Sequence, residues 1–291
     1  MNKTKVKLSY VKTKSGGVYA LPTHCSQKTF NDFTNFRFDH NDIIVCTHPK
    51  SGTTWMMNLI YLIIHKGSLV PEGKHLSQYF TFCETADRDV MLRQRVDDVI
   101  PRLYQSHVTR GLFPATNGSK IVCVLRHPKD VCVSYFYHTR ELVDLYRFEG
   151  NFDDYFPLFV KGEKDYGNYF DHVTEWMTCF NDPNCFNVLY EDMLTDTKSV
   201  VMAVACFLGY EHHVTDPDIL NRILDRCSFG FMSNNMEKFS KYVVDGKCPV
   251  VRRGVIGDWK NHMSKEQAKI IDDKCKEYGI DHLWKKYADL L

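Results

Sequence analysis

The sequence lacks the features that mark membrane, secreted and nucleic-acid-binding proteins. Its most apolar run, residues 55–64, contains Asn58 and is far shorter than the roughly 20 residues that span a bilayer. The basic start of the chain has no apolar segment after it, so we expect no signal peptide. A net charge of +1 provides no general electrostatic attraction for nucleic acid. We therefore expect neither a membrane nor a nucleic acid among its partners.

Paired cysteines are missing as well. The 11 cysteines are odd in number and include no CxxC pair, which argues against a disulfide framework and against a structural zinc site. No HExxH segment is present either, so we expect no metal. Free thiols are typical of the reducing cytoplasm, where we place the protein. Cys206, for example, lies in an apolar helical pattern in which cysteine behaves as a small hydrophobe.

What is present is the composition of a folded protein. Hydrophobic residues make up 44% of the 291 positions and charged residues 25%, a balance typical of globular domains. No internal repeat or low-complexity linker divides the chain. We therefore predict a single domain over residues 1–291 that buries roughly three-quarters of its unfolded surface. Residues 1–40 show no clear period and are expected to wrap a core formed later in the chain.

Strands and helices alternate along the rest of the chain. Short apolar runs predict buried strands at residues 43–46, 121–125 and 186–190. Helices are predicted at 54–65, 198–208 and 216–226, with another starting at Pro128 and a last one opened by a capping box of Ser264 and Gln267. This alternation predicts an α/β fold with a central parallel sheet flanked by helices. Ligands bind beyond the carboxyl ends of such strands.

The segment between the first predicted strand and its helix carries the polar groups of an anion site. It runs Thr47-His48-Pro49-Lys50-Ser51-Gly52-Thr53-Thr54-Trp55. Small residues let backbone N–H groups and the helix dipole approach an anion, and Lys50 adds a movable charge. A helix cap explains any one hydroxyl, but not a lysine, a glycine and three hydroxyls together. We predict a P-loop-like phosphate site, although the lysine precedes the glycine and the order therefore differs from GxxxxGK[ST].

Four segments together resemble the cytosolic sulfotransferase family. PKSGTTW at residues 49–55 resembles the family's 5′-phosphosulfate loop, and residues 124–135 resemble its 3′-phosphate strand and helix. Residues 252–260 are similar to its RKGxxGDWK signature, and residues 190–193 to a recurrent YEDM segment. The segments occur in family order within residues 40–265. The resemblance implies the donor 3′-phosphoadenosine 5′-phosphosulfate (PAPS), whose product is 3′-phosphoadenosine 5′-phosphate (PAP).

The resemblance also implies which residues bind this nucleotide. The 5′ end would be held by Lys50, Ser51, Gly52, Thr53 and Thr54, the 3′-phosphate by Arg126, Ser134, Arg252, Arg253 and Gly254, and the adenine by Trp55, Tyr190, Cys227 and Phe229. The residues support part of this independently. Arg126 follows a buried strand, where an unpaired guanidinium is unfavourable and a phosphate matches its planar fork.

For catalysis, the resemblance implies His107 as the general base. His107 is one of 13 histidines and stands out because it matches the family's catalytic histidine in a KTHL-type segment. A neutral imidazole would take the proton of an acceptor hydroxyl as the oxygen attacks sulfur. Lys50 would stabilise the charge that develops on the bridging oxygen. Direct in-line transfer would then depend on positioning and electrostatics, as phosphoryl transfer does.

Two departures from the family pattern affect these expectations. Gln105 replaces a lysine two residues before His107, which removes a positive charge and predicts weaker stabilisation of the sulfuryl group without loss of activity. Cys227 replaces a threonine that commonly contacts the adenine.

A third departure concerns assembly. The family's dimer motif K-x-x-x-T-V-x-x-x-E is matched only by Lys260 and Ser264, because Lys265 and Lys269 replace the valine and the glutamate. A charge reversal at a small self-complementary contact weakens it. We therefore expect a monomer or a weak homodimer.

The acceptor pocket is the least determined part of the site. Phe82, Gln105 and His138 are predicted to contact a small apolar acceptor that carries a phenolic or other hydroxyl, or an amine. Further rings are candidates for the same pocket, namely Tyr79, Phe80, Tyr135, Phe136 and Tyr137. The polar segment 231–250, which contains glycine and proline, is predicted to be a mobile lid.

Two other classes of protein remain open at the level of sequence, and a third is not expected. A P-loop kinase would share the strand, loop and helix but needs a lysine after the glycine and carboxylates for magnesium. A non-catalytic nucleotide-binding protein would keep the donor segments and lose the base; His107 argues against it, whereas Gln105 leaves it open. A membrane-anchored sulfotransferase acting on glycans or protein tyrosines would need an N-terminal anchor, which we do not expect here.

Overall fold

A five-stranded parallel sheet with the order β4-β5-β3-β6-β7 forms the centre of the molecule. The computed structural model describes residues 4–93, 101–239 and 252–291. The sheet strands are β3 (Ile43–Thr47), β4 (Thr81–Phe82), β5 (Leu103–Ser106), β6 (Lys120–Leu125) and β7 (Cys185–Leu189). The three strands predicted from apolar runs are β3, β6 and β7, so the α/β class and the parallel sheet are confirmed.

Successive residues of the sheet strands enter two different cores. On β3, Ile43 and Val45 face one cluster of buried side chains, whereas Ile44 and Cys46 face the other. This alternation follows from the strand period of two. Because both faces are covered, the strand carries no polar face, and all five of its residues are buried.

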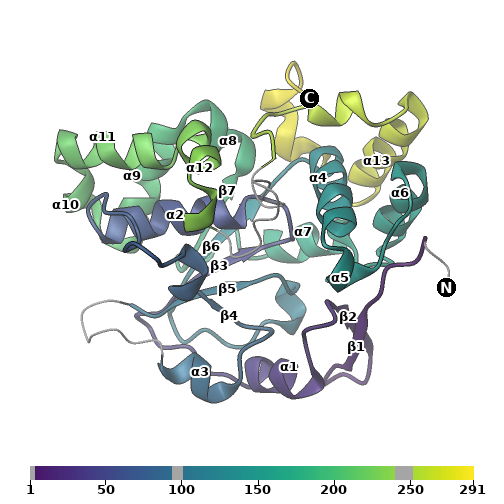
Figure 1. The fold of residues 1–291 in the computed structure, drawn as a ribbon, viewed down its shortest axis with the longest axis horizontal. Coiled ribbons are helices and arrows are strands. Elements are labelled where there is room, and N and C mark those ends of the chain that lie inside the picture. The colour runs from purple at the N-terminus through teal and green to yellow at the C-terminus, as the bar shows by residue number, and fades with distance from the viewer. Residues whose placement is uncertain (1–3, 94–100, 240–251) are drawn as a thin grey trace.

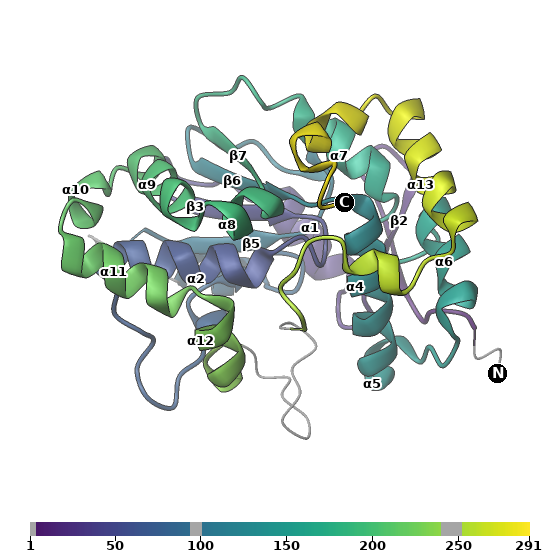
Figure 2. The same cartoon turned by 90° about the horizontal axis from the view of Figure 1, so that it is seen from above.

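Two groups of helices cover the two faces (Figure 1, Figure 2). The group packed on Val45 comprises α2 (Thr53–Ile64), α8 (Tyr190–Thr195), α9 (Thr197–Leu208), α10 (Glu211–Val214), α11 (Pro217–Arg226) and α12 (Phe229–Asn234). The group packed on Cys46 comprises α1 (Gln27–Thr34), α3 (Arg88–Arg93), α4 (Pro128–Glu141), α5 (Val143–Tyr146), α6 (Phe152–Lys161), α7 (Tyr169–Met177) and α13 (Lys265–Glu277). Among the described helices, none is long and apolar enough to cross a membrane.

The predicted helices match observed ones to within a few residues. Helix α2 is apolar on nearly every side and is almost fully buried, as its unbroken sequence predicts. Helix α9 ends at Gly209, which adopts a left-handed conformation. The capping box of Ser264 and Gln267 opens α13. Cys206, however, is exposed, because the buried stripe of α9 runs through positions 200, 201, 204, 205 and 208 and leaves position 206 outside.

The first 40 residues contain regular structure that their sequence, without a clear period, did not predict. Strands β1 (Ser9–Lys12) and β2 (Val18–Leu21) form an antiparallel hairpin, and helix α1 follows. Helix α1 begins at a capping box formed by Ser26 and Thr29.

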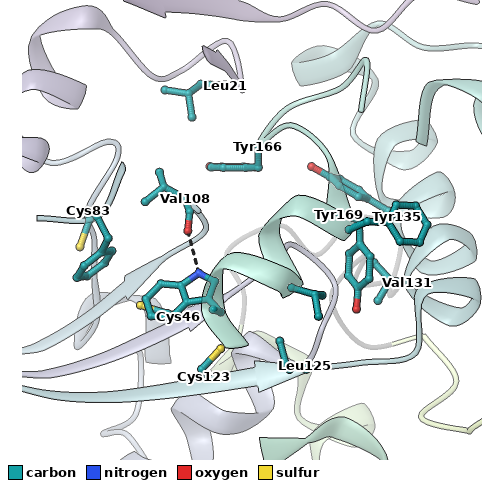
Figure 3. Packing of buried hydrophobic residues seen from close by; sticks show 14 of the residues in the cluster. Leu21, Cys46, Cys83, Val108, Cys123, Leu125, Val131, Tyr135, Tyr166 and Tyr169 are labelled. Atoms are coloured by element: carbon teal, nitrogen blue, oxygen red, sulfur yellow. Dashed lines mark hydrogen bonds between the residues drawn. The ribbon is translucent and has the colours of Figure 1, made fainter. Parts of the chain in front are cut away.

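The segment after β5 is tied to the helices behind the sheet. The indole nitrogen of Trp176 on α7 donates to the carbonyl of Val108, which lies 3.3 Å away (Figure 3, dashed line). Cys46 and Cys123 lie directly opposite each other on β3 and β6, below this contact. The backbone around residue 107 is therefore fixed by the core.

The predicted lid begins with regular structure. Residues 229–234 form α12, and residues 236–238 form a 3-10 turn. Residues 240–250 of the predicted lid lie outside the described part of the chain, so the mobility of this segment stays a prediction.

Candidate active site

The loop between β3 and α2 contains two residues with positive φ angles. Lys50 has a φ of 70° and Gly52 a φ of 110°. A Cβ atom on Gly52 would lie 2.7 Å from the Tyr190 ring, so only glycine fits between the loop and α8. Ser51 is buried, and its hydroxyl has no hydrogen-bond partner among the described residues. A buried hydroxyl without a partner is unfavourable unless a ligand supplies the missing hydrogen bond.

Arg126 joins this loop to the end of β6. Its Nη1 donates to the carbonyl of Lys50 at 3.1 Å, and its guanidinium lies 4.2 Å from the centre of the Tyr190 ring. The Nε of Arg126 is buried and has no protein partner in the described chain. The guanidinium is therefore fixed in place, and its Nε–H group remains available to donate a hydrogen bond to an anion.

The segment of Arg252, Arg253 and Gly254 is held by a buried carboxylate. Asp258 forms ion pairs with Arg252 at 2.6 Å and with Arg253 at 2.8 Å. Burial favours a higher pKa for Asp258, but the Arg252 and Asn261 hydrogen bonds hold that pKa below its usual value. A Cβ on Gly254, whose φ is 63°, would collide with the Phe229 ring. The segment that carries Arg252 and Arg253 therefore packs directly against the Phe229 ring.

Asp130 links this segment to helix α4. Its two carboxylate oxygens accept from the backbone N–H groups of Gly257 at 2.8 Å and Trp259 at 3.0 Å. Asp130 stands in the first turn of α4, four residues after Arg126. The two basic elements are thus fixed relative to each other although about 125 residues separate them in the sequence.

His107 lies at the carboxyl end of β5 with a defined protonation state. Its Nδ1 is 2.8 Å from the carbonyl oxygen of Thr47. A carbonyl can only accept, so Nδ1 carries the proton and Nε2 keeps its lone pair. Burial lowers the pKa of His107 to about 4, and the charges of Lys50 and Lys164 act in the same direction. The imidazole is therefore neutral at physiological pH, as a general base requires.

Glu84 fixes the backbone that carries His107. Its Oε1 accepts from the Ser106 hydroxyl at 2.8 Å, from the His107 N–H at 2.6 Å and from the Val108 N–H at 3.2 Å. Glu84 is fully buried, and burial raises its pKa to about 7. Glu84, Asp130 and Asp258 were not predicted from the sequence. The only available signal was that the last two stand inside the resembling segments.

The structure brings most predicted site residues to one cleft. Its lining includes Lys50, Gly52, Thr53, Thr54, Trp55, Gln105, His107, Arg126, Ser134, His138, Tyr190, Cys227, Phe229, Arg252, Arg253 and Gly254. The carboxyl ends of β3, β5, β6 and β7 all lead into this cleft. Ser51 belongs to the loop, but it is buried and is not among the residues of the cleft lining. Phe82 is also outside the lining, but its ring packs edge-on against His107 at 5.4 Å.

The aromatic residues proposed for the acceptor pocket belong mostly to the cores. Phe80 is buried and Tyr79 partly buried in the cluster on the α2 side, whereas Tyr135 and Phe136 are buried in the cluster on the α4 side. Tyr137 packs on His262 at 5.4 Å and lies outside the cleft lining. Among the described residues these rings are not part of the cleft lining, so a role for them in an acceptor pocket stays a prediction. His138 and Gln105 do line the cleft.

Comparison with known proteins decides what kind of site this is. The model of the sulfotransferase domain matches residues 40–289, most of the chain. The chain belongs to the sulfotransferase family. The sulfotransferase is 31% identical to sulfotransferase 2A1 of Macaca fascicularis over 253 residues, which cover 84% of this chain and 87% of that protein. It is also 31% identical over 250 residues to a 3-beta-hydroxysteroid sulfotransferase of Cavia porcellus, covering 83% and 85% of the two chains.

Solved structures give the same assignment. Mouse sulfotransferase SULT7A1, crystallised with PAP, superposes on this sulfotransferase with a TM-score of 0.78 and 25% identity, covering 97% of this chain and 100% of the other. The resemblance to the cytosolic sulfotransferases inferred from the four segments is thereby confirmed, as is the enzyme class. Within the described residues of the sulfotransferase, no group of three or more potential metal ligands lies together.

Proposed function

We propose that this sulfotransferase transfers a sulfuryl group from PAPS to the hydroxyl or amine of a small apolar acceptor, with His107 as the general base. The observation that carries the proposal is the hydrogen bond from His107 to the Thr47 carbonyl, which leaves Nε2 basic at the cleft wall that also contains Lys50. PAPS supplies a sulfuryl group activated by its phosphate leaving group.

The buried polar atoms of the site fit such a donor. Ser51 Oγ, Arg126 Nε and Arg252 Nε are buried and have no partner in the described part of the chain. Ser51 lies at the start of α2, where the helix dipole favours the 5′ end of the nucleotide. Arg126, Arg252 and Arg253 line the same cleft as Tyr190 and Phe229, and we assign the 3′-phosphate to these three arginines. SULT7A1 was crystallised with PAP, which agrees with this donor.

The residues of this chain divide the chemical work. His107 Nε2 accepts the proton of the acceptor while Glu84 and Thr47 keep the imidazole in place. Lys50 places its ammonium group beside the leaving phosphate. Gln105 stands where the resemblance implies a lysine. It contributes a hydrogen bond but lacks the positive charge of the lysine. Trp55 packs edge-on against Tyr190 at 5.5 Å, which gives the adenine an aromatic wall beside Cys227.

The acceptor side of the cleft is formed by Gln105, His107 and His138, with Phe82 behind His107. This wall combines aromatic rings with polar nitrogens, which suits a hydroxylated apolar molecule. The steroid named in the Cavia porcellus relative is of this kind. Free cysteines throughout the described chain fit a cytoplasmic enzyme, which is where we propose it acts.

The test is an assay with radiolabelled sulfuryl donor against phenols, amines, steroids and alcohols. We expect transfer to at least one class, and a large loss in His107→Ala with PAP binding retained. A wild-type protein that binds PAP and transfers to none of these would instead be a nucleotide-binding protein without this activity.

A further inference from the structure

Four ionisable side chains are buried behind the phosphosulfate loop and outside the cleft. They are His48, Lys164, Asp165 and His172, each at most 1% exposed. They come from the β3–α2 loop, the α6–α7 connection and α7. None of them lines the cleft or takes part in the proposed chemistry. Burying such groups is unfavourable unless they are paired.

Lys164 and His48 form a hydrogen-bonded chain that ends on the loop backbone. Lys164 Nζ lies 3.1 Å from His48 Nε2, and His48 Nδ1 lies 3.1 Å from the Pro49 carbonyl oxygen. Because the carbonyl can only accept, Nδ1 carries the proton and Nε2 accepts from Lys164. Burial keeps the pKa of His48 well below its usual value, with Lys164 acting in the same direction. Both hydrogen bonds therefore have a fixed direction: Lys164 donates to His48, and His48 donates to the Pro49 carbonyl.

The backbone at the end of this chain is strained. Lys50, the residue after Pro49, has a φ of 70°, which side chains other than glycine rarely adopt. Such a conformation is unfavourable and persists where its surroundings hold it. The Lys50 carbonyl is held by Arg126, and the Pro49 carbonyl by His48. Both carbonyls that flank the Lys50 α-carbon are thus held by side chains.

A buried lysine at position 164 is energetically unfavourable if its only role is to fill space. Burial lowers its pKa to about 7, although the charge of Asp165 opposes this shift. Its Nζ lies 4.0 Å from the centre of the Tyr135 ring, which is itself buried (Figure 3). The Asp165 carboxylate accepts from the Tyr146 hydroxyl at 2.9 Å. An apolar side chain of equal length would fill this space at a lower desolvation penalty.

We propose that Lys164 is a positioning residue for donor binding, which fixes the phosphosulfate loop through the side chain of His48. This inference rests on the proposed function, because it takes the loop to hold the 5′ end of the donor. Lys164 acts on the backbone of Pro49 and Lys50 and touches neither the donor nor the acceptor. Removing His48 frees the Pro49 carbonyl, and removing Lys164 releases the imidazole that holds this carbonyl. In either case the backbone on the N-terminal side of Lys50 is less firmly held.

The test compares Lys164→Met, His48→Phe and the double variant with the wild type. PAP affinity is measured by calorimetry at about pH 6, where the Lys164 ammonium predominates, and thermal unfolding is recorded for the same samples. We expect each single variant to bind PAP about tenfold more weakly, as the loss of one charge-assisted hydrogen bond implies. The double variant should be no weaker than either single one, because both substitutions break the same link.

Thermal stability of the double variant distinguishes a positioning role of Lys164 from a role in core packing. Met and Phe form an apolar pair of similar volume, so the double variant should unfold at the wild-type temperature or above it. We expect this stable protein to keep the weakened PAP affinity and a raised KM for PAPS. Lys120→Met is the matched control: Lys120 donates to the Phe207 carbonyl at the opposite end of β6, and its loss should leave PAP affinity unchanged.

Two outcomes would overturn the proposal, and they differ. A double variant with wild-type stability and wild-type PAP affinity would mean that the pair only packs the core. A wild-type protein that fails to bind PAP at all would remove the proposed function and this inference with it. If a single variant does not fold, the double variant still decides between positioning and packing.

Discussion

The Nδ1 atom of His107 lies 2.8 Å from the carbonyl oxygen of Thr47, although 60 residues separate them. The contact follows from the register of β3 and β5, in which Cys46 is paired with Ser106. One residue beyond that pair, the carbonyl and the imidazole meet. A slip of one residue would turn His107 to the other face of the sheet. The basic nitrogen of the site is thus set by strand pairing.

Replacing the base should separate binding from catalysis. His107→Asn should reduce kcat by about a hundredfold to ten-thousandfold, the usual contribution of a general base, while PAP affinity stays near that of the wild type. The measurement is initial rate with radiolabelled donor, together with calorimetry of PAP. His212→Ala, at an exposed histidine of α10, is the control and should keep full activity. Equal rates for the two variants would rule out His107 as the base.

Glu84 should make stability depend on pH. Its pKa is raised from 4.5 to about 7 in the folded protein, so between these values the unfolded chain loses a proton that the folded chain keeps. Folding stability therefore falls as pH rises through this window. Glu84→Gln cannot ionise and retains an oxygen for the three hydrogen bonds. Its stability relative to the wild type should increase by roughly 2–3 kcal/mol between pH 4.5 and 8.

Urea unfolding at several pH values measures this difference. Glu277→Gln serves as the control, because Glu277 is exposed and forms a surface ion pair with Lys274; its effect should be small and vary little with pH. A stability difference for Glu84→Gln that is the same at pH 4.5 and pH 8 would contradict the raised pKa.

Gly254→Ala should weaken PAP binding through Phe229. The added Cβ would collide with the Phe229 ring, so the ring has to move away from the cleft. We expect about a tenfold loss of PAP affinity. Gly279→Ala is a matched control, because Gly279 has a φ of 66° and no atom lies within 4 Å of the point that a Cβ would occupy. Both variants carry the same backbone penalty, so equal PAP affinities would count against a role for the close contact.

The protein should sediment as a monomer or a weakly associating dimer. Lys269 lies on α13 and pairs with Asp273 of the same helix, and it replaces the glutamate of the family's dimer motif. Lys265→Val combined with Lys269→Glu should strengthen self-association at micromolar concentration by removing repulsion across a two-fold axis. The prediction would fail if the wild type sedimented as a tight dimer that Lys269→Glu dissociates.

The sequence predicted those elements whose signal is local. Strand β3, helix α2 and the loop between them are contiguous, and the apolar runs on either side define them. Strand β4 has two residues and β5 reads Leu-Tyr-Gln-Ser, so neither has an apolar run or a clear alternation. Strands β4 and β5 form because each pairs with a parallel neighbouring strand that satisfies their backbone hydrogen bonds.

Site residues were predictable where they stood inside a resembling segment. Arg126 and Arg252 were found in this way, and both line the cleft. Glu84 was not, because it is one of 36 acidic residues and its importance arises only from contact with backbone more than 20 residues away. Lys164 was missed for the same reason, since its partner His48 lies 116 residues earlier.

Asp258 gives the nucleotide site a resident counter-ion. Asp258 already pairs with Arg252 and Arg253. If these arginines hold the 3′-phosphate as proposed, an arriving phosphate would exchange with the carboxylate and gain only the difference between two ion pairs. When the product leaves, we expect the carboxylate to pair with the arginines again, which would favour product release. Asp258→Asn should slow PAP release in stopped-flow experiments, and an unchanged or faster release would show that no such exchange takes place.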